Sequence, residues 1–265
     1  MYIKTISESK LNTYKQCKLK YKFRYVNRLA EPKGSNVDAL HFGSYIHKVL
    51  EDAIEAETLE EMVEVSKRVK GNYSISESYQ GKDLKCFTNF LKFNKGLGKT
   101  VGKELVYEVP IKDDITVNGI IDRVIQGENG GYLVIDYKTS KREKTRVDLF
   151  QDTQLKGYAY AISKLFKVPV SEVVVAHYYP LTNNFVYLTY TSNQISAYCK
   201  MIVDKIWMIR KTKAEDVRPS RNEFCNWCAY KVMCPEFQTA HECASRLEKE
   251  KARSKQLREA RKDRK

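Results

Sequence analysis

Two aspartates and a lysine near the middle of the chain have side chains that can act on a phosphate group. Asp136 and Lys138 follow the apolar run 132–135, and Asp122 precedes them within 119–123. On neighbouring strands, the carboxylates could hold a divalent cation while the lysine stabilises an attacking hydroxide or the charge that develops on phosphate. An isolated Asp-x-Lys is usually solvated surface or part of an ion network, so the interpretation depends on its neighbours.

The spacing of apolar residues predicts the elements that must position these side chains. Strand patterns are found at 105–109, 115–125, 132–137, 172–179 and 185–190. Helical patterns are found at 10–25, 40–56, 59–69, 84–97, 149–166 and 193–211, with a loop opening at 33–36. The order α-β-β-β-α-β-β predicts an α/β fold, in which helices flank a mixed central sheet of about five strands after a helical N-terminal part.

The charge balance indicates a polyanionic partner. The 265 residues include 47 Lys and Arg against 33 Asp and Glu, a formal net charge of +14. This excess favours nucleic acid over an acidic membrane surface. No stretch is long and apolar enough to span a bilayer, and residues 1–10 lack the hydrophobic segment of a signal peptide. We therefore expect an intracellular, cytoplasmic protein.

Two further motifs flank the aspartates. Residues 43–51 have the pattern Gly-x-x-x-His-x-x-Leu-Glu on a predicted helix, and residues 154–158 read Gln-Leu-Lys-Gly-Tyr on another. Gln154 and Tyr158 are four residues apart, so they share one helical face and can point into the same cleft. Together with 119–123 and Asp136-x-Lys138, these motifs resemble those of the RecB-like branch of the PD-(D/E)XK nuclease superfamily. They occur in the same order as in that family, and the resemblance spans nearly the whole chain.

The resemblance implies a restriction-endonuclease-like core and assigns a role to each motif residue. Asp122, Asp136, His47 and the backbone carbonyl of Tyr137 would bind a divalent ion, and Lys138 would orient or help to deprotonate the attacking water. Oxygen ligands with retained waters suit Mg²⁺, and the imidazole makes Mn²⁺ an equally acceptable ion.

The same resemblance assigns Gln154 and Tyr158 to substrate positioning. On the residues alone, Tyr158 could equally be a packing residue of its helix. Glu108, on the strand before the Asp122 strand, could add an acidic contact.

The sequence contains four histidines that could be the metal ligand. A histidine beside an apolar stripe is more often a satisfied, partly buried side chain than a metal ligand. The Gly-x-x-x-His pattern selects His47 over its neighbour His41, and it includes neither His177 nor His241.

Three of the seven cysteines are clustered as Cys225-x-x-Cys228-x-x-x-x-x-Cys234, and Cys17 lies far upstream. An odd number of cysteines in a reducing compartment argues against a disulfide framework and for metal ligation. One cysteine near the start and three near the end resemble RecB-like nucleases with an iron–sulfur cluster, including AddB-type and CRISPR-associated exonucleases. That resemblance implies a [4Fe–4S] cluster, and Zn²⁺ is the alternative because it also accepts four thiolates. The other thiols are Cys86, Cys199 and Cys243, of which Cys243 is near enough to Cys234 to be an alternative ligand.

We expect one nuclease domain over 1–239, with a helical insertion around 50–100 and the cysteine site as a staple between the terminal segments. The tail 240–265 is predicted to be a basic helix, a DNA-binding arm or disordered. Near the N-terminus, basic and aromatic residues interleave on a surface that could grip phosphates and stack unpaired bases. These residues are Tyr14, Lys15, Lys18, Lys20, Tyr21, Lys22, Phe23, Arg24, Tyr25 and Arg28.

Together the motifs predict a metal-dependent DNA exonuclease that acts on single strands or DNA ends in recombination, repair or replication. The alternatives are an endonuclease and a catalytically idle DNA-binding subunit of a helicase–nuclease complex. The residues fix neither the polarity of cleavage nor a preference for DNA over RNA. The sequence has no Gly-x-x-x-x-Gly-Lys-Ser/Thr loop, so ATP-driven unwinding would come from a helicase or recombination partner.

Overall fold

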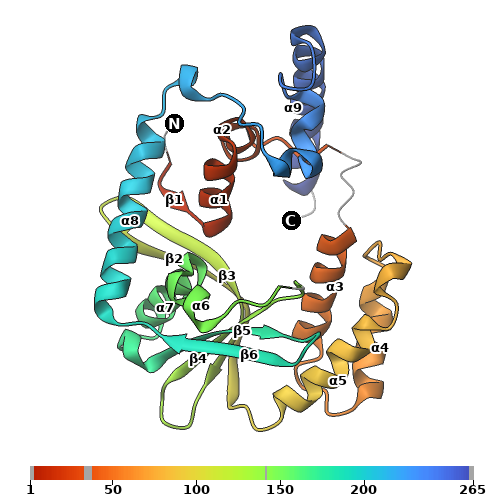
Figure 1. The fold of residues 1–265 in the computed structure, drawn as a ribbon, viewed down its shortest axis with the longest axis vertical. Helices are drawn as coiled ribbons and strands as arrows, with labels where there is room; N and C mark the ends of the chain where they lie inside the picture. Colours follow the sequence, from red (N-terminus) through yellow and green to blue (C-terminus); the bar gives the residue numbers. More distant parts are fainter. Residues whose placement is uncertain (1–2, 33–37, 141, 263–265) are drawn as a thin grey trace. The chain divides into compact units, whose positions relative to one another are not determined.

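The computed structural model describes residues 3–32, 38–140 and 142–262 (Figure 1). The loop predicted at 33–36 lies outside these residues. The chain divides into two compact units. We call residues 38–203 the central unit, and residues 1–37 with 204–265 the terminal unit. A single nuclease domain over 1–239 stays a prediction.

The central unit is built on a mixed sheet. Its strands are β2 (Lys99–Lys112), β3 (Ile115–Gln126), β4 (Tyr132–Tyr137), β5 (Val173–Tyr179) and β6 (Asn184–Thr189). The pairs β2–β3, β3–β4 and β5–β6 are antiparallel, whereas β4 and β5 are parallel. The parallel pair needs a crossover, which the helices between β4 and β5 supply. This arrangement confirms the predicted α/β class with a mixed sheet flanked by helices.

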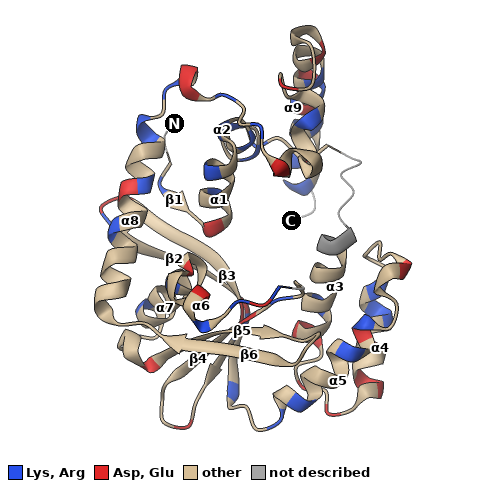
Figure 2. Ribbon diagram, in the orientation of Figure 1, with Lys and Arg blue, Asp and Glu red and all other residues tan. Residues whose placement is uncertain are grey.

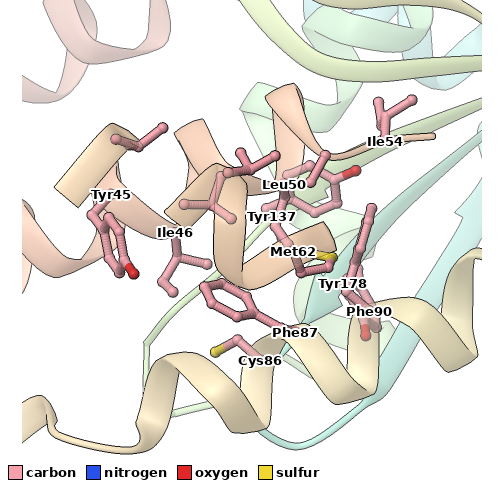
Figure 3. Close-up of a cluster of buried hydrophobic side chains, with 14 of the residues drawn as sticks. Tyr45, Ile46, Leu50, Ile54, Met62, Cys86, Phe87, Phe90, Tyr137 and Tyr178 are labelled. Atoms are coloured by element: carbon pink, nitrogen blue, oxygen red, sulfur yellow. The ribbon is translucent and has the colours of Figure 1, made fainter. Parts of the chain in front are cut away.

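Three helices form a core with the sheet. They are α3 (Asp38–Asp52), α4 (Leu59–Lys70) and α5 (Lys82–Asn94). Figure 3 shows their apolar side chains meeting Tyr137 and Tyr178 from the strands. Because this cluster is buried, it fixes where α3 stands against the end of β4. The position of α3 matters because it carries His47.

The predicted helix 149–166 is in fact two helices, α6 (Arg146–Gln151) and α7 (Thr153–Leu165). Asp152 separates them, and its side chain accepts hydrogen bonds from the backbone N–H groups of Gln154 and Leu155. An aspartate that caps a helix start in this way competes with continuation of the previous helix. The break sets the direction of α7, which carries Gln154 and Tyr158.

The predicted helix 10–25 is also interrupted. It comprises α1 (Glu8–Gln16), α2 (Lys18–Tyr21) and a π-helical turn at Lys22–Val26. Cys17 lies between α1 and α2 in an extended conformation, and its sulfur accepts a 3.4 Å hydrogen bond from the backbone N–H of Lys20. Because of this break, the Cys17 side chain does not follow the helical spacing of its neighbours.

The rest of the terminal unit comes from the C-terminal part of the chain. Helix α8 (Ser192–Lys211) enters it, short 3-10 turns cover Glu223–Trp227 and Ala229–Met233, and α9 (Ala240–Lys262) follows. A small core joins the two ends of the chain, where Phe23 and Leu29 pack with Tyr230 and Met233. No helix among the described residues has the length and apolar character needed to cross a bilayer.

The net charge of +14 belongs entirely to one unit. The terminal unit contains 26 of the 47 lysines and arginines but only 12 of the 33 aspartates and glutamates. The central unit contains the remaining 21 of each and is formally neutral. Basic residues recur along α2 and α9 (Figure 2).

Candidate active site

Asp122 lies where β3 and β4 separate. The last registered pair of the two strands is Arg123 with Ile135. Beyond it, Oδ2 of Asp122 accepts a 2.7 Å hydrogen bond from the backbone N–H of Tyr137. A side-chain oxygen thus satisfies a strand amide that has lost its usual partner. The bond holds the Asp122 carboxylate against the backbone of Tyr137, whose carbonyl was predicted as a ligand.

His47 and Glu104 bring two further ligand groups to Asp122. His47 Nδ1 lies 3.4 Å from Asp122 Oδ2, and one ligand atom from each of the three residues lies within 4.8 Å of the others. Burial acts to lower the pKa of His47, but the Asp122 carboxylate outweighs it and the pKa is raised. Burial, followed by the charge of Asp122, raises the pKa of Glu104. A bound cation would relieve this repulsion between carboxylates.

The sequence did not predict Glu104 and suggested Glu108 instead. Glu108 is exposed, its carboxylate accepts a 3.0 Å hydrogen bond from Thr116, and it is not part of the group around Asp122. The register of β2 and β3 places Glu104 opposite Asp122. The φ angle of Glu104 is 43°, a left-handed conformation that is uncommon for residues other than glycine.

The buried Asp136 and the partly exposed Lys138 form a pair that two residues of α7 complete. Lys138 Nζ lies 2.5 Å from Asp136 Oδ2, while Asp136 Oδ1 accepts a hydrogen bond from Gln154 Nε2 (3.2 Å) and lies 3.4 Å from the Tyr158 hydroxyl. Gln154 Oε1 in turn accepts a 3.4 Å bond from Lys138 Nζ. The structure thus brings together the four residues that the two motifs supply.

The environment perturbs both charges of this pair. Burial raises the pKa of Asp136 to about 6, although Lys138 acts in the opposite direction. Burial acts to lower the pKa of Lys138, but Asp136 and then Asp122 more than offset it, so the pKa is raised. The lysine therefore keeps its proton as long as the carboxylates around it carry their charge.

His177 is a buried neighbour that the motifs did not include. It sits beside Asp136 in the β4–β5 register, with Nε2 3.5 Å from Asp136 Oδ2 and 3.9 Å from Asp152 Oδ2. Burial lowers the pKa of His177 to about 4. A neutral imidazole therefore lies between the Asp136 carboxylate and the residue that caps α7.

A cavity of about 550 Å³ gives access to these groups. Its walls include His47, Glu104, Asp122, Tyr137 and Lys138, together with Gly43, Ser44, Lys48, Glu51, Tyr73, Ile120, Thr139 and Ser140. Asp136 is only 2% exposed and does not line the cavity.

Gly43 explains the first position of the Gly-x-x-x-His pattern. A Cβ atom at this position would lie 3.0 Å from Oγ1 of Thr139, so a larger residue would require either the Thr139 side chain or α3 to shift. The glycine lets α3 bring His47 close to Asp122.

The four predicted cysteine ligands line one small cavity in the terminal unit. Cys17, Cys225, Cys228 and Cys234 share it with Gln16, Lys20, Pro219, Ser220, Arg221, Asn222, Phe224, Lys231, Glu236 and Phe237. Burial raises the pKa of the Cys228 and Cys234 thiols, and each is raised further by Cys17 and Cys225. Cys243 does not line this cavity, and Cys86 is buried in the core of the central unit.

The spacing of the four sulfur atoms bears on the metal they suit. Among the described residues, no three cysteine sulfurs lie within 4.8 Å of one another. Four thiolates around one zinc ion, with Zn–S bonds of about 2.3 Å, would have sulfurs about 3.8 Å apart. A [4Fe–4S] cluster binds each cysteine to a different iron atom and therefore holds the sulfurs farther apart.

Comparison with known proteins shows which family this chain matches. The PD-(D/E)XK nuclease superfamily matches residues 5–235. An ATP-dependent helicase/deoxyribonuclease subunit from Streptococcus uberis is 26% identical over 151 residues, and its counterpart from Streptococcus agalactiae is 26% identical over 178 residues. These matches cover 52% and 60% of this chain but only 14% and 16% of the relatives. A crystal structure of a candidate exonuclease from Eubacterium rectale has a similar fold, with 17% identity, a TM-score of 0.53, and coverage of 86% of this chain and 88% of that one.

Proposed function

Since the chain belongs to the PD-(D/E)XK nuclease superfamily, we propose that it hydrolyses DNA phosphodiester bonds with the help of a divalent metal ion, and that it acts as an exonuclease on single strands or DNA ends. The observation that carries this proposal is the convergence of His47, Glu104 and Asp122 on one point beside the ion pair of Asp136 and Lys138.

The donor set of this site fits Mg²⁺ or Mn²⁺. His47, Glu104, Asp122 and the carbonyl of Tyr137 would hold the ion. Asp136, also predicted as a ligand, lies outside this group and pairs with Lys138. Carboxylate and carbonyl oxygens suit both ions, and the single imidazole is well accepted by Mn²⁺. A bound divalent ion would supply an activated water and neutralise charge on the phosphate.

The remaining residues act on the substrate and on the water. Lys138 Nζ offers a positive charge and a proton donor at the edge of the cavity, where charge develops on the phosphate oxygens. Gln154 binds both Lys138 and Asp136, and so fixes the direction of the ammonium group. The hydroxyl of Tyr158 donates to the backbone carbonyl of Ile120 at 2.8 Å, which ties α7 to the strand that carries Asp122.

The substrate and the partner are proposed from the relatives and from the charge. The streptococcal relatives are subunits of an ATP-dependent helicase/deoxyribonuclease. The excess of basic residues suits the phosphates of DNA, and a helicase partner would deliver single strands. A DNA substrate and seven unpaired cysteines are both compatible with the reducing cytoplasm.

For the cysteine site we propose a [4Fe–4S] cluster, with Zn²⁺ as the alternative. The cavity that all four cysteines line supports a shared metal site, and the resemblance of their placement to iron–sulfur nucleases favours the cluster. Cys17 comes from the N-terminal part of the chain and the other three ligands from the C-terminal part. A cluster bound by all four would cross-link the two ends and stabilise the terminal unit.

The decisive experiment uses end-labelled single-stranded DNA, with and without blocked 5′ and 3′ ends, and circular single-stranded DNA as a comparison. In Mn²⁺ or Mg²⁺ and without ATP, we expect mononucleotides or short products from free ends and no cleavage of the circle. Cleavage of the circle would instead make the protein an endonuclease. Binding without any product would identify a catalytically idle DNA-binding subunit.

Glu104 and Glu108 provide a matched pair for testing the metal site. Both are glutamates of β2, but only Glu104 belongs to the group around Asp122. Glu104→Gln should weaken Mn²⁺ binding, measured by calorimetry on the protein without DNA, whereas Glu108→Gln should leave it unchanged. Equal affinities of the two variants would remove Glu104 from the ligand set.

A further inference from the structure

A second concave surface lies in the terminal unit, within the part of the chain that also carries the cysteines. It is a groove of about 620 Å³ between α1 and the C-terminal half of α8. None of the metal-site residues lines it. The lining residues are Tyr14, Lys15, Lys18, Asp204, Trp207, Met208, Lys211, Thr212 and Asp216.

Two large apolar side chains stand exposed in this groove. Trp207 is 48% exposed and Met208 is 43% exposed. They share one face of α8 with Lys211, which is three and four residues further along the helix. Burial of these side chains by a ligand would be favourable, because both leave apolar surface in contact with water.

The indole of Trp207 is held in place by its own unit. The guanidinium of Arg210 lies 5.1 Å from the ring centroid, and Nε of Arg210 donates a 2.9 Å hydrogen bond to the backbone carbonyl of Ile3. A cation beside an aromatic ring and anchored to the main chain limits the rotation of that ring. A fixed and exposed aromatic plane is the arrangement on which an unpaired base can stack.

The floor and rim of the groove suit a phosphate backbone. Tyr14 and Thr212 close the floor with a 2.5 Å hydrogen bond between their hydroxyl groups. Lys15, Lys18 and Lys211 line the groove and outnumber its two acidic residues. The unit around them carries the whole net charge of the protein, so the field over the groove attracts a polyanion.

We propose that this groove binds an unpaired segment of single-stranded DNA, with a base stacked on Trp207 and the flanking phosphates on the three lysines. The inference rests on the proposed function, since it names the form of DNA that the nuclease would hold outside its metal site. An apolar face without this charge would fit a protein partner equally well, but the basic rim and the basic unit favour nucleic acid.

The test is tryptophan fluorescence in EDTA, which prevents cleavage. In a Trp227→Phe background, Trp207 is the only tryptophan of the sequence. Addition of a short oligothymidylate should quench its emission, because stacking on a base changes the surroundings of the indole. Absence of quenching at an oligothymidylate concentration that saturates the protein would overturn the proposal.

Affinity measurements on variants complete the test. Trp207→Ala should weaken oligothymidylate binding by roughly 10-fold or more, and Trp207→Phe should retain most of the affinity, because base–aromatic stacking contributes about that much per base. Leu257→Ala, which removes an exposed apolar side chain of α9 outside the groove, should bind as the parent protein does. Equal affinity of the Trp207→Ala variant would contradict the proposal, as would a preference of the groove for a peptide over oligothymidylate.

A small substrate separates this inference from the proposed function. Hydrolysis of bis(p-nitrophenyl) phosphate in Mn²⁺ needs only the metal site and should be unchanged in Trp207→Ala. If the parent protein binds oligothymidylate through Trp207 but does not hydrolyse the small diester, the nuclease proposal fails and the groove remains. If it hydrolyses the diester and Trp207 has no effect on DNA affinity, only the groove is refuted.

Discussion

The two units of this protein differ in the kind of electrostatics they use. The central unit is formally neutral, and the charges of its candidate site are partly or fully buried and close together, as in the Asp136 and Lys138 pair. The terminal unit has a net charge of +14, carried by exposed lysines and arginines that face solvent. Buried charges act at short range and are barely screened, whereas exposed charges act over about a Debye length of 8–10 Å. We infer that chemistry and attraction of the substrate are assigned to different parts of the chain.

The largest expected effect separates cleavage from binding. Lys138→Ala and Asp122→Ala should each lower the rate of cleavage by roughly 10²-fold or more, because each removes charge stabilisation at the reacting phosphate. DNA affinity should stay nearly unchanged, since the basic residues of the terminal unit are untouched. Single-turnover assays and fluorescence anisotropy would measure the two quantities. A parallel loss of affinity would show that the central unit also contributes strongly to binding.

A second prediction addresses the terminal unit alone. Cys228→Ser should abolish the absorption near 400 nm that is expected of a [4Fe–4S] cluster, and it should lower the thermal stability of the protein. Cys243→Ser is the matched control, because Cys243 does not line the cysteine cavity. A colourless parent protein that contains one zinc ion per chain would replace the cluster with zinc.

The salt dependence of binding tests where the attraction arises. Replacing Lys15, Lys18 and Lys211 with glutamine should reduce the slope of log affinity against log salt by about 0.7 for each phosphate of a single strand that is no longer neutralised. As a control, three exposed lysines of the central unit can be replaced in the same way. These are Lys85, Lys112 and Lys167. An equal reduction by both sets would contradict the division of charge between the units.

The smallest expected effect concerns the stability of the central unit. The pKa of Asp136 is raised to about 6, so ionisation of this carboxyl above that pH opposes folding. In metal-free protein, the free energy of unfolding should therefore fall as the pH rises from about 4 to 6, and Asp136→Asn should remove this fall. Below about pH 3, where the carboxyl is protonated in both states, the stability of the parent protein should no longer depend on this group. Urea unfolding at several pH values would measure it.

The proximity of the motif residues was predictable because it depends on local order along the chain. Asp136 and Lys138 follow an apolar run at the end of β4, and Asp122 lies within β3 at the point where that strand separates from β4. The structure places the three residues as neighbours. His47 was selected by the glycine four residues before it, and Gly43 indeed stands in a close contact with Thr139. Such motifs can be recognised in the sequence because each lies within a few consecutive residues.

There is a physical reason why the position of Glu104 could not be predicted from the sequence. Counting pairs back from the hairpin turn at 113–114 sets Glu104 opposite Arg123. A register shift between Pro110 and Lys112 moves it by one position, to face Asp122. A one-residue slip exchanges the two faces of a strand, and no residue pattern in this sequence signals the shift.

His177 and the two helix breaks depended on tertiary contacts. His177 meets Asp136 only because β5 pairs in parallel with β4, after a crossover of more than thirty residues. Asp152 and Cys17 each interrupt a continuous helical pattern of apolar residues. The side chain of each accepts a hydrogen bond from a backbone N–H at the start of the next helix, a local competition that periodicity does not register.

The hydrogen bond from the Tyr137 amide to Asp122 has a consequence for how the protein can diverge. The direction of this carboxylate is set by main chain, which every amino acid except proline provides. Neighbouring side chains in the cavity can therefore be exchanged, and substrate preference altered, without turning the aspartate. A homologue could thus acquire a new specificity while the Asp122 carboxylate stayed in the same position.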